Sequence, residues 1–190
     1  MEQKFYDAVA ASPVIAAVKN MEGLEQCLAT DTIQVVFLLF GDICSIGGIV
    51  ARVKQAGKLA MVHADLVTGL SGSKEIAVDF LHSATQTDGI ISTRPMLLRR
   101  GRELGMLTVL RVFAIDSKAV SNLGRETEGG MPDVIEILPG TLCKVLRRLS
   151  RELPVPLIAG GRLSDKADVL AALGAGALCV SASDESLWAL

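Results

Sequence analysis

The chain has 190 residues and a formal net charge of −2 at pH 7, and half of its residues are hydrophobic. That charge gives no general attraction to nucleic acid, so any RNA contact has to come from a local basic patch. The longest strongly apolar run, residues 35–41, is far shorter than the ~18 residues that a membrane-spanning helix needs, which excludes an integral membrane protein.

The apolar surplus is instead typical of parallel strands that are buried on both faces. The first residues, Met1 to Lys4, lack the basic-then-apolar layout of a signal peptide, so we expect a cytoplasmic protein. The length fits a single domain that spans residues 1–190.

Short β-branched or apolar runs recur along the chain, with stretches of helical periodicity between them. We predict strands at residues 14–18, 33–40, 59–63, 89–93, 107–113, 134–138, 155–159 and 177–181. Eight strand–helix units in 190 residues are about the minimum for a closed barrel, which more often has ~250 residues. The predicted fold is therefore a compact single-domain (β/α)8 TIM-type barrel, with an open doubly wound sheet as the structural alternative.

Capping residues and glycines predict where some of the helices begin and end. Helix starts are predicted at residues 116–117, 141 and 164–165, and helix ends at Gly57, Gly105 and Gly174. The longest loose segment, residues 66–73, follows the third predicted strand. Because loops at this end of a barrel often close over a ligand, we consider this segment a candidate lid.

The four cysteines are Cys27, Cys44, Cys143 and Cys179. They show neither CxxC nor Cys/His spacing, and two of them lie in apolar strand or helix patterns. We therefore expect buried, reduced thiols and no metal site.

Nearly every predicted strand ends in a group that can bind a charged or hydroxylated molecule. In chain order these are Lys19, Asp42, His63 with Asp65, Thr93 with Arg94, Arg111, Glu136, Gly160 with Gly161, and Ser181 with Ser183. In a barrel of parallel strands these ends meet at one mouth, which is where such barrels bind their ligands. The pattern as a whole predicts a small-molecule site at the mouth.

The last two strand ends predict a phosphate site. The pair Gly160 and Gly161 and the serines Ser181 and Ser183 would leave backbone N–H groups uncrowded, as phosphate binding requires. Two alternatives stay open, because the glycines can serve a tight turn alone and nearby carboxylates can occupy the helix N-termini.

Arg111 and Glu136 each interrupt an apolar strand, where an unpaired charge would be unfavourable. They can form a mutual salt bridge inside the barrel, or contact a ligand, or do both. Lys19 can bind an anion or merely solvate a loop, and His63 can bind ligand directly or be held by the Asp65 carboxylate in a structural role.

Two arginine clusters are candidates for an RNA-binding surface, with a solvated helix face as the simpler alternative. They are Arg94, Arg99, Arg100 and Arg102 in one, and Arg147, Arg148 and Arg151 in the other. Aromatic residues make up only 4% of the chain, so stacking on bases would contribute little.

The strand ends also carry longer sequence motifs. They are Ala17-Val18-Lys19-Asn20, His63-Ala64-Asp65-Leu66-Val67-Thr68-Gly69-Leu70, Gly89-Ile90-Ile91-Ser92-Thr93-Arg94, Arg111-Val112-Phe113-Ala114-Ile115-Asp116-Ser117, Glu136-Ile137-Leu138-Pro139-Gly140, Ile158-Ala159-Gly160-Gly161 and Leu187-Trp188. With these motifs in this order, the chain resembles the glycerol-3-phosphate-responsive antiterminator family, the regulators of glycerol uptake operons, over nearly its whole length.

The resemblance implies a barrel that binds glycerol 3-phosphate as an effector and acts on leader mRNA to prevent early termination of transcription. It implies neither a catalytic residue nor a cofactor. Gly160, Gly161, Ser181 and Ser183 would hold the phosphate. The rest of the ligand would be surrounded by Lys19, His63, Asp65, Arg94, Arg111 and Glu136.

The chain departs from the family pattern at three places. Leu110 stands where the family usually has Gln, Arg162 where it tends to have Leu, and Ser181-Ala182-Ser183 where it has an ending similar to Thr-Ser-Asn. Leu110 puts part of the polar network in doubt, and Arg162 can strengthen anion binding or indicate a changed ligand.

Two other functions remain open from the sequence. Glu136, His63 and Asp65 supply candidate acids and bases for an enzyme that acts on a small phosphorylated metabolite, although no nucleophile–base signature accompanies them. A barrel that senses the ligand and signals to a protein is the other alternative. The oligomeric state is left open between a monomer and a homodimer.

Overall fold

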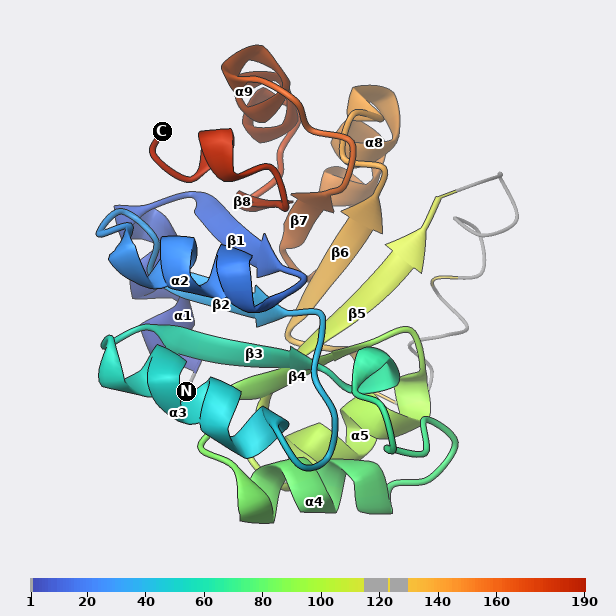
Figure 1. Ribbon diagram of the computed structural model, residues 1–190. Coiled ribbons are helices and arrows are strands. Elements are labelled where there is room, and N and C mark those ends of the chain that lie inside the picture. Colours follow the sequence, from blue (N-terminus) through green and yellow to red (C-terminus); the bar gives the residue numbers. More distant parts are fainter. Residues whose placement is uncertain (1, 115–122, 124–129) are drawn as a thin grey trace.

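Eight parallel strands close into a barrel in the computed structural model, which describes residues 2–114, 123 and 130–190 (Figure 1). The strands are β1 (Val14–Val18), β2 (Val35–Leu38), β3 (Leu59–His63), β4 (Gly89–Ser92), β5 (Leu107–Phe113), β6 (Val134–Leu138), β7 (Leu157–Gly160) and β8 (Cys179–Ala182). Each strand pairs with the next in the chain, and β8 pairs with β1, where Ile15 lies opposite Ser181. The predicted barrel is confirmed.

Most helices lie outside the ring of strands (Figure 1). The exception is α1, which precedes the first strand in the chain and packs against the inner layer of the barrel. They are α1 (Glu2–Ala11), α2 (Met21–Ala29), α3 (Ile46–Gln55), α4 (Ile76–Ala84), α5 (Pro95–Glu103), α8 (Cys143–Glu152) and α9 (Lys166–Gly174), with single 3-10 turns at Ala64–Leu66 and Glu185–Leu187. Within the described part of the chain, none of these helices is long and apolar enough to cross a membrane.

Strand bounds differ from the prediction where local chemistry intervenes. β2 is shorter than predicted, and β7 begins at Leu157 rather than at residue 155. Pro156 has no N–H group to donate to a ladder, so regular pairing starts after it. β8 also begins later than predicted, at Cys179 rather than at residue 177.

The three helix-end predictions are confirmed. Gly57 and Gly105 follow α3 and α5 with φ of 76° and 74°, as predicted. α9 ends at Gly174, also as predicted, and the left-handed residue that follows this helix is Gly176 with φ of 100°. Asp165 caps α9 by accepting a hydrogen bond from the Asp168 N–H at 2.8 Å.

Two other predictions concern loops. Residue 141 does not cap α8, which begins at Cys143 after Leu142 with no side-chain cap. The predicted start at residues 116–117 lies outside the described residues. The candidate lid at 66–73 is tied to the neighbouring loop by a bridge between Asp42 and Thr68, while its motion stays a prediction.

Strand side chains alternate between two hydrophobic layers, as the period of two in a β-strand requires. The inner layer fills the barrel, and Phe5 and Val9 of α1 pack against it from one end. The strand residues of this inner layer are Ile15, Ala17, Val35, Phe37, Met61, Ile91, Leu107, Val109, Val134, Ile158 and Cys179. The barrel is therefore solid through most of its length.

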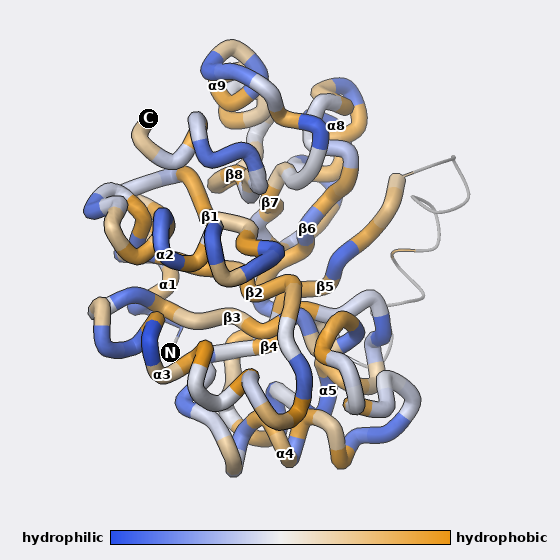
Figure 2. The backbone as a smooth tube through the Cα atoms, viewed as in Figure 1, coloured by the Kyte–Doolittle hydropathy of each residue, from blue (hydrophilic) through white to orange (hydrophobic). Residues whose placement is uncertain are grey.

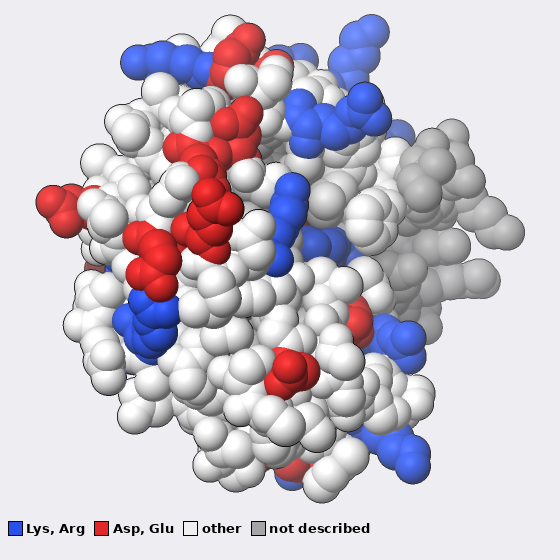
Figure 3. Space-filling model, in the orientation of Figure 1, with Lys and Arg blue, Asp and Glu red and all other residues white. Residues whose placement is uncertain are grey.

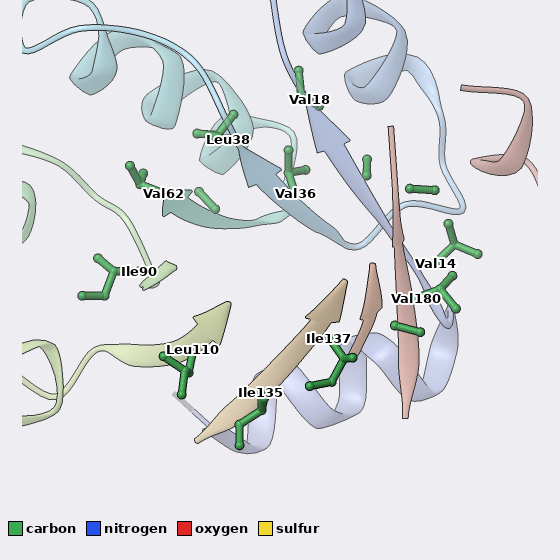
Figure 4. Close-up of a cluster of buried hydrophobic side chains, with 14 of the residues drawn as sticks. Val14, Val18, Val36, Leu38, Val62, Ile90, Leu110, Ile135, Ile137 and Val180 are labelled. Carbon is green, nitrogen blue, oxygen red and sulfur yellow. The ribbon is translucent and has the colours of Figure 1, made fainter. Parts of the chain in front are cut away.

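The outer layer joins the strands to the helices. Figure 4 shows Val36, Leu38, Val62, Ile90 and Leu110 among the side chains of this layer. The hydropathy colouring follows the same division, with hydrophobic residues along the strands and hydrophilic ones toward the outside of the helices (Figure 2). Because Leu110 packs in the outer layer, the departure at this position leaves the polar residues of the mouth intact.

Cysteine burial matches the prediction only in part. Cys27 and Cys179 are buried, whereas Cys143 is half-buried and Cys44 is exposed in the loop after β2. Burial raises the pKa of the Cys27 thiol to about 11, so this thiol is uncharged and unreactive at neutral pH.

Candidate functional site

A cavity of about 330 Å³ opens at the C-terminal mouth of the barrel. Its lining combines apolar, cationic and hydroxyl groups: Ala17, Lys19, Leu39, Arg111, Phe113, Glu136, Leu138, Gly161, Arg162, Ser181 and Ser183. A cavity of this size suits a small ligand. Six of the predicted site residues meet there, namely Lys19, Arg111, Glu136, Gly161, Ser181 and Ser183.

Arg111 and Glu136 form a buried ion pair at the floor of this cavity. They face each other across β5 and β6 in the strand register, and the Arg111 Nε–H donates to Glu136 Oε2 at 2.5 Å. Ser181 on β8 donates its hydroxyl to the other oxygen, Oε1, also at 2.5 Å. Glu136 is fully buried, and these two hydrogen bonds give each of its oxygens a protein donor. The salt-bridge alternative is therefore confirmed.

Arg111 retains donors beyond this pair. Among the described residues only its Nε–H makes a hydrogen bond, and a guanidinium carries four further N–H groups. Its side chain lines the cavity, so an anion or hydroxyl in the cavity could accept from the terminal nitrogens.

Gly160 makes the contact between Glu136 and Ser181 possible. A Cβ at this position would lie 2.6 Å from Glu136 Oε1 and 2.6 Å from Ser181 Oγ. Only glycine leaves room for both groups on the inner face of β7. Packing thus explains the glycine at position 160, which the sequence context does not reveal. The cavity lining contains Gly161 rather than Gly160.

Gly161 and Arg162 turn the chain away from β7 with left-handed backbones. Their φ angles are 71° and 58°, and Arg162 is the one residue other than glycine with positive φ in the described chain. Both line the cavity, where Arg162 joins Lys19 and Arg111 as a third cation. Figure 3 shows basic side chains near the centre of this face, beside a band of acidic ones.

Carboxylates already occupy the helix starts after β7 and β8. Asp165 caps α9, and Asp184 accepts from the Ser186 N–H at 3.0 Å in the turn that follows β8. These caps confirm that carboxylates lie at both ends, while their competition with a phosphate stays a prediction. An anion at the mouth would therefore rely on the cations and on the loop backbone more than on helix dipoles.

Asp65 and Arg94 lie outside the cavity lining. Asp65 accepts hydrogen bonds from the Ser92 hydroxyl at 2.9 Å and from the Thr93 N–H at 2.7 Å. The Arg94 Nε is 3.7 Å from the same carboxylate. These bonds join the ends of β3 and β4 in a polar brace, which is where the structure places both of these predicted site residues.

His63 is buried between this brace and the ion pair. Its side chain is 3% exposed, and its Nδ1 lies 3.8 Å from Asp65 Oδ2 without a hydrogen-bond partner in the described residues. Burial and the charge of Arg111 lower the pKa of His63 to about 4, against the opposing effect of Asp65. His63 is therefore neutral at pH 7 and adds no charge to the mouth.

The buried neutral imidazole predicts a loss of stability in mild acid. The unfolded chain takes up a proton near pH 6.5, whereas the folded protein resists protonation until about pH 4. Stability should thus fall as the pH drops through this window, by about 3 kcal/mol at most. Urea unfolding between pH 7 and 4.5 measures this, and the free energy of unfolding should depend less on pH in His63→Gln than in the wild type. Equal pH dependence in the two proteins would contradict a buried neutral His63.

Sequence patterns do not single out the apolar wall of the cavity. Leu39, Phe113 and Leu138 line it, and each lies at an inward position near a strand end. The two-residue period of a strand could have identified two of them, because it places Phe113 on the same face as Arg111, and Leu138 on the same face as Glu136. Across the described ranges, no group of three His, Cys, Asp or Glu side chains is placed to hold a metal ion.

A family model and a curated relative both match nearly the whole chain. Residues 14–188 match the model of the family described as "Glycerol-3-phosphate responsive antiterminator". The chain is 39% identical over 179 residues to the uncharacterized protein YgcP of Escherichia coli (strain K12), covering 94% of this chain and 93% of that protein.

Two solved structures are similar over nearly their whole length. The glycerol uptake operon antiterminator regulatory protein of Listeria monocytogenes str. 4b F2365 is 32% identical with a TM-score of 0.89, covering 93% of this chain and 95% of that one. A glycerol uptake operon antiterminator-related protein of Thermotoga maritima MSB8 is 32% identical with a TM-score of 0.82, covering 93% and 98%.

Proposed function

The chain belongs to the glycerol-3-phosphate responsive antiterminator family, and from this premise we propose that it binds glycerol 3-phosphate and acts on leader mRNA. On this proposal the bound effector increases the affinity for RNA, which prevents early termination of transcription in genes of glycerol uptake or metabolism. The protein would act in the cytoplasm, as a monomer or a homodimer.

The charge balance of the cavity is the observation that carries the ligand assignment. Three cations, Lys19, Arg111 and Arg162, face one carboxylate, Glu136, which leaves an excess of two positive charges. A phosphate monoester carries about −1.5 to −2 at pH 7, so the two charges nearly match. A neutral polyol would leave this excess uncompensated.

The polar groups of the cavity suit the two ends of glycerol 3-phosphate. The phosphate would lie near Lys19, Arg162, Gly161 and Ser183, at the rim. The hydroxyls would lie deeper, where Arg111 has spare donors and each Glu136 oxygen has a second lone pair. Phe113 would cover the carbon chain.

The state of the candidate acids and bases supports a regulator over an enzyme. Glu136 is held by Arg111 and Ser181, and the buried His63 does not line the cavity. A general acid or base has to come within hydrogen-bond reach of the reacting group, which His63 does not, and both Glu136 oxygens already accept hydrogen bonds from the protein. We therefore assign no catalytic residue and no cofactor, and treat glycerol 3-phosphate as an effector.

Thermal unfolding with three small molecules tests the ligand. At a concentration about 100 times its dissociation constant, glycerol 3-phosphate should stabilise the protein by about 2.7 kcal/mol, or roughly 5–10 °C in melting temperature. Glycerol should give no shift at the same concentration, and inorganic phosphate a smaller one. Read-through of a leader terminator in single-round transcription is the second readout and should rise only with protein and effector together.

Absence of a shift with glycerol 3-phosphate at millimolar concentration would contradict the ligand assignment. Turnover of glycerol 3-phosphate or a triose phosphate by the purified protein would contradict the regulatory role. A full thermal shift without any read-through would leave the ligand site standing and refute the RNA role.

A further inference from the structure

One face of α8 carries a row of exposed cations. Lys144, Arg147, Arg148 and Arg151 recur at the spacing that places residues on one side of a helix, while Leu146 and Leu149 are buried on the other side. With Glu152 they line a shallow surface hollow of about 380 Å³. Figure 3 shows Lys or Arg side chains in the upper right of the view, in the region of α8.

The charges of this face, which we call the α8 basic face, are largely unneutralised. The only ion pair that the described residues give it joins Arg148 to Glu152 at 3.7 Å, and both of these side chains are more than half exposed. Such a pair contributes little and is screened by salt. Lys144, Arg147 and Arg151 have no acidic partner in the described parts of the chain, although the protein as a whole has a net charge of −2.

The arginines of α5 differ in this respect. Arg99 pairs with Glu75 at 3.0 Å, and Arg100 pairs with Asp79 at 2.7 Å as well as with Glu103 at 2.8 Å. Arg102 donates to the backbone carbonyl of Met131. Two of these three α5 arginines are thus paired with acids, and all three brace α5 against its neighbours, whereas three of the four α8 cations have no acidic partner in the described residues.

We propose that the α8 basic face binds the phosphate backbone of RNA. That RNA is the partner rests on the proposed function. That α8 is the surface rests on its unpaired charges. At a rise of 1.5 Å per residue, Lys144 and Arg151 are ~10 Å apart along the helix axis, so the row follows several nucleotides of one strand. The scarcity of aromatic residues favours contacts to phosphate over stacking on bases.

The loop before α8 connects this face to the ligand cavity. Gly140, between β6 and α8, donates its N–H to the carbonyl oxygens of Gly160 at 2.6 Å and Gly161 at 3.0 Å. Leu138, at the end of β6, lines the cavity and would be 3.2 Å from a Cβ on Gly161. A ligand that orders the glycine pair would thereby also order the start of α8.

Charge-matched variants test the surface. The α8 variant is Lys144→Gln/Arg147→Gln/Arg151→Gln, and the control is Arg99→Gln/Arg100→Gln/Arg102→Gln on α5. Both remove three positive charges, so a general electrostatic effect would be equal in the two. Binding is measured by fluorescence anisotropy over 50–300 mM KCl, with glycerol 3-phosphate present. The probes are a labelled transcript of the organism's own glycerol-uptake leader and a 20-nucleotide poly(U).

The α8 variant should lose about 2 from the slope of log affinity against log salt, because each lost phosphate contact on a single strand removes ~0.7. At 0.15 M salt this loss corresponds to about 50-fold weaker binding. The α5 control should bind within about threefold of the wild type. Circular dichroism and the thermal shift with glycerol 3-phosphate confirm that both variants fold and retain the effector site.

Equal RNA binding by the α8 variant and the wild type would overturn the inference and leave an acidic protein as the partner of this face. An equal loss in both variants would also overturn it. If the wild type ignores the leader transcript, the proposed function fails separately. The surface is then judged on poly(U), where a loss confined to the α8 variant supports it and no difference refutes it.

Discussion

Replacing Glu136 by leucine is expected to lower the free energy of unfolding by about 3–5 kcal/mol. Glu136 is fully buried and accepts hydrogen bonds from Arg111 and Ser181 inside the barrel. Its removal leaves the guanidinium of Arg111, which is itself only 9% exposed, without its counter-charge. Urea unfolding at pH 7 measures the change, which should appear as a lower midpoint at constant m-value.

A double variant separates the charge effect from lost packing. Arg111→Met/Glu136→Leu removes both charges, and it should recover most of the stability because a buried pair can be replaced by apolar groups at little net loss. The same variant should not bind glycerol 3-phosphate, since the deeper polar end of the cavity is gone. A loss below 1 kcal/mol for Glu136→Leu alone would show that water reaches the pair and that the barrel floor is not closed.

Gly161→Val is expected to abolish the thermal shift with glycerol 3-phosphate, which corresponds to at least 100-fold weaker binding. Gly161 lines the cavity with φ of 71°, and its Cβ would lie 3.2 Å from Leu138 Cδ2. A branched side chain would fill the rim where we place the phosphate. It would also disfavour the left-handed backbone by about 1–2 kcal/mol. Isothermal titration calorimetry measures the affinity.

Gly105→Val is the matched control, because Gly105 has nearly the same backbone with φ of 74° and nothing within 4 Å of its Cβ position. It lies before β5, at the end of the barrel remote from the mouth. Both variants should lose similar stability, but Gly105→Val should keep the full ligand shift. Unchanged affinity in Gly161→Val would mean that the ligand lies elsewhere.

The barrel was predictable because its strands are short, apolar and evenly separated. β1, β3, β5 and β6 have the predicted bounds, and β1 and β6 are each bounded by turn or polar residues that stop an apolar run. β7 and β8 are displaced by one or two residues. Pro156 sets the start of β7 through its missing N–H group, which hydrophobic periodicity does not report.

The site was predictable as a set of strand ends, but not in its internal arrangement. Arg111 and Glu136 attracted attention as charges in apolar strands, and the structure places them in contact at 2.5 Å. Which strand ends reach the cavity depends on the tilt and register of the closed barrel, and Asp65 is instead held by Ser92 and Thr93. The low pKa of His63 depends on burial beside Arg111, which no local pattern encodes.

Arg162 illustrates how function can oppose stability at a single position. A residue with a Cβ disfavours a φ of 58°, and glycine would relieve that strain. Under the proposed function, however, glycine would also remove one of the three cations that attract the phosphate. Selection for a more stable fold and selection for a tighter effector site therefore favour different residues here. Under the proposed function, arginine at this position therefore keeps a cation at the effector site at a small cost in backbone stability.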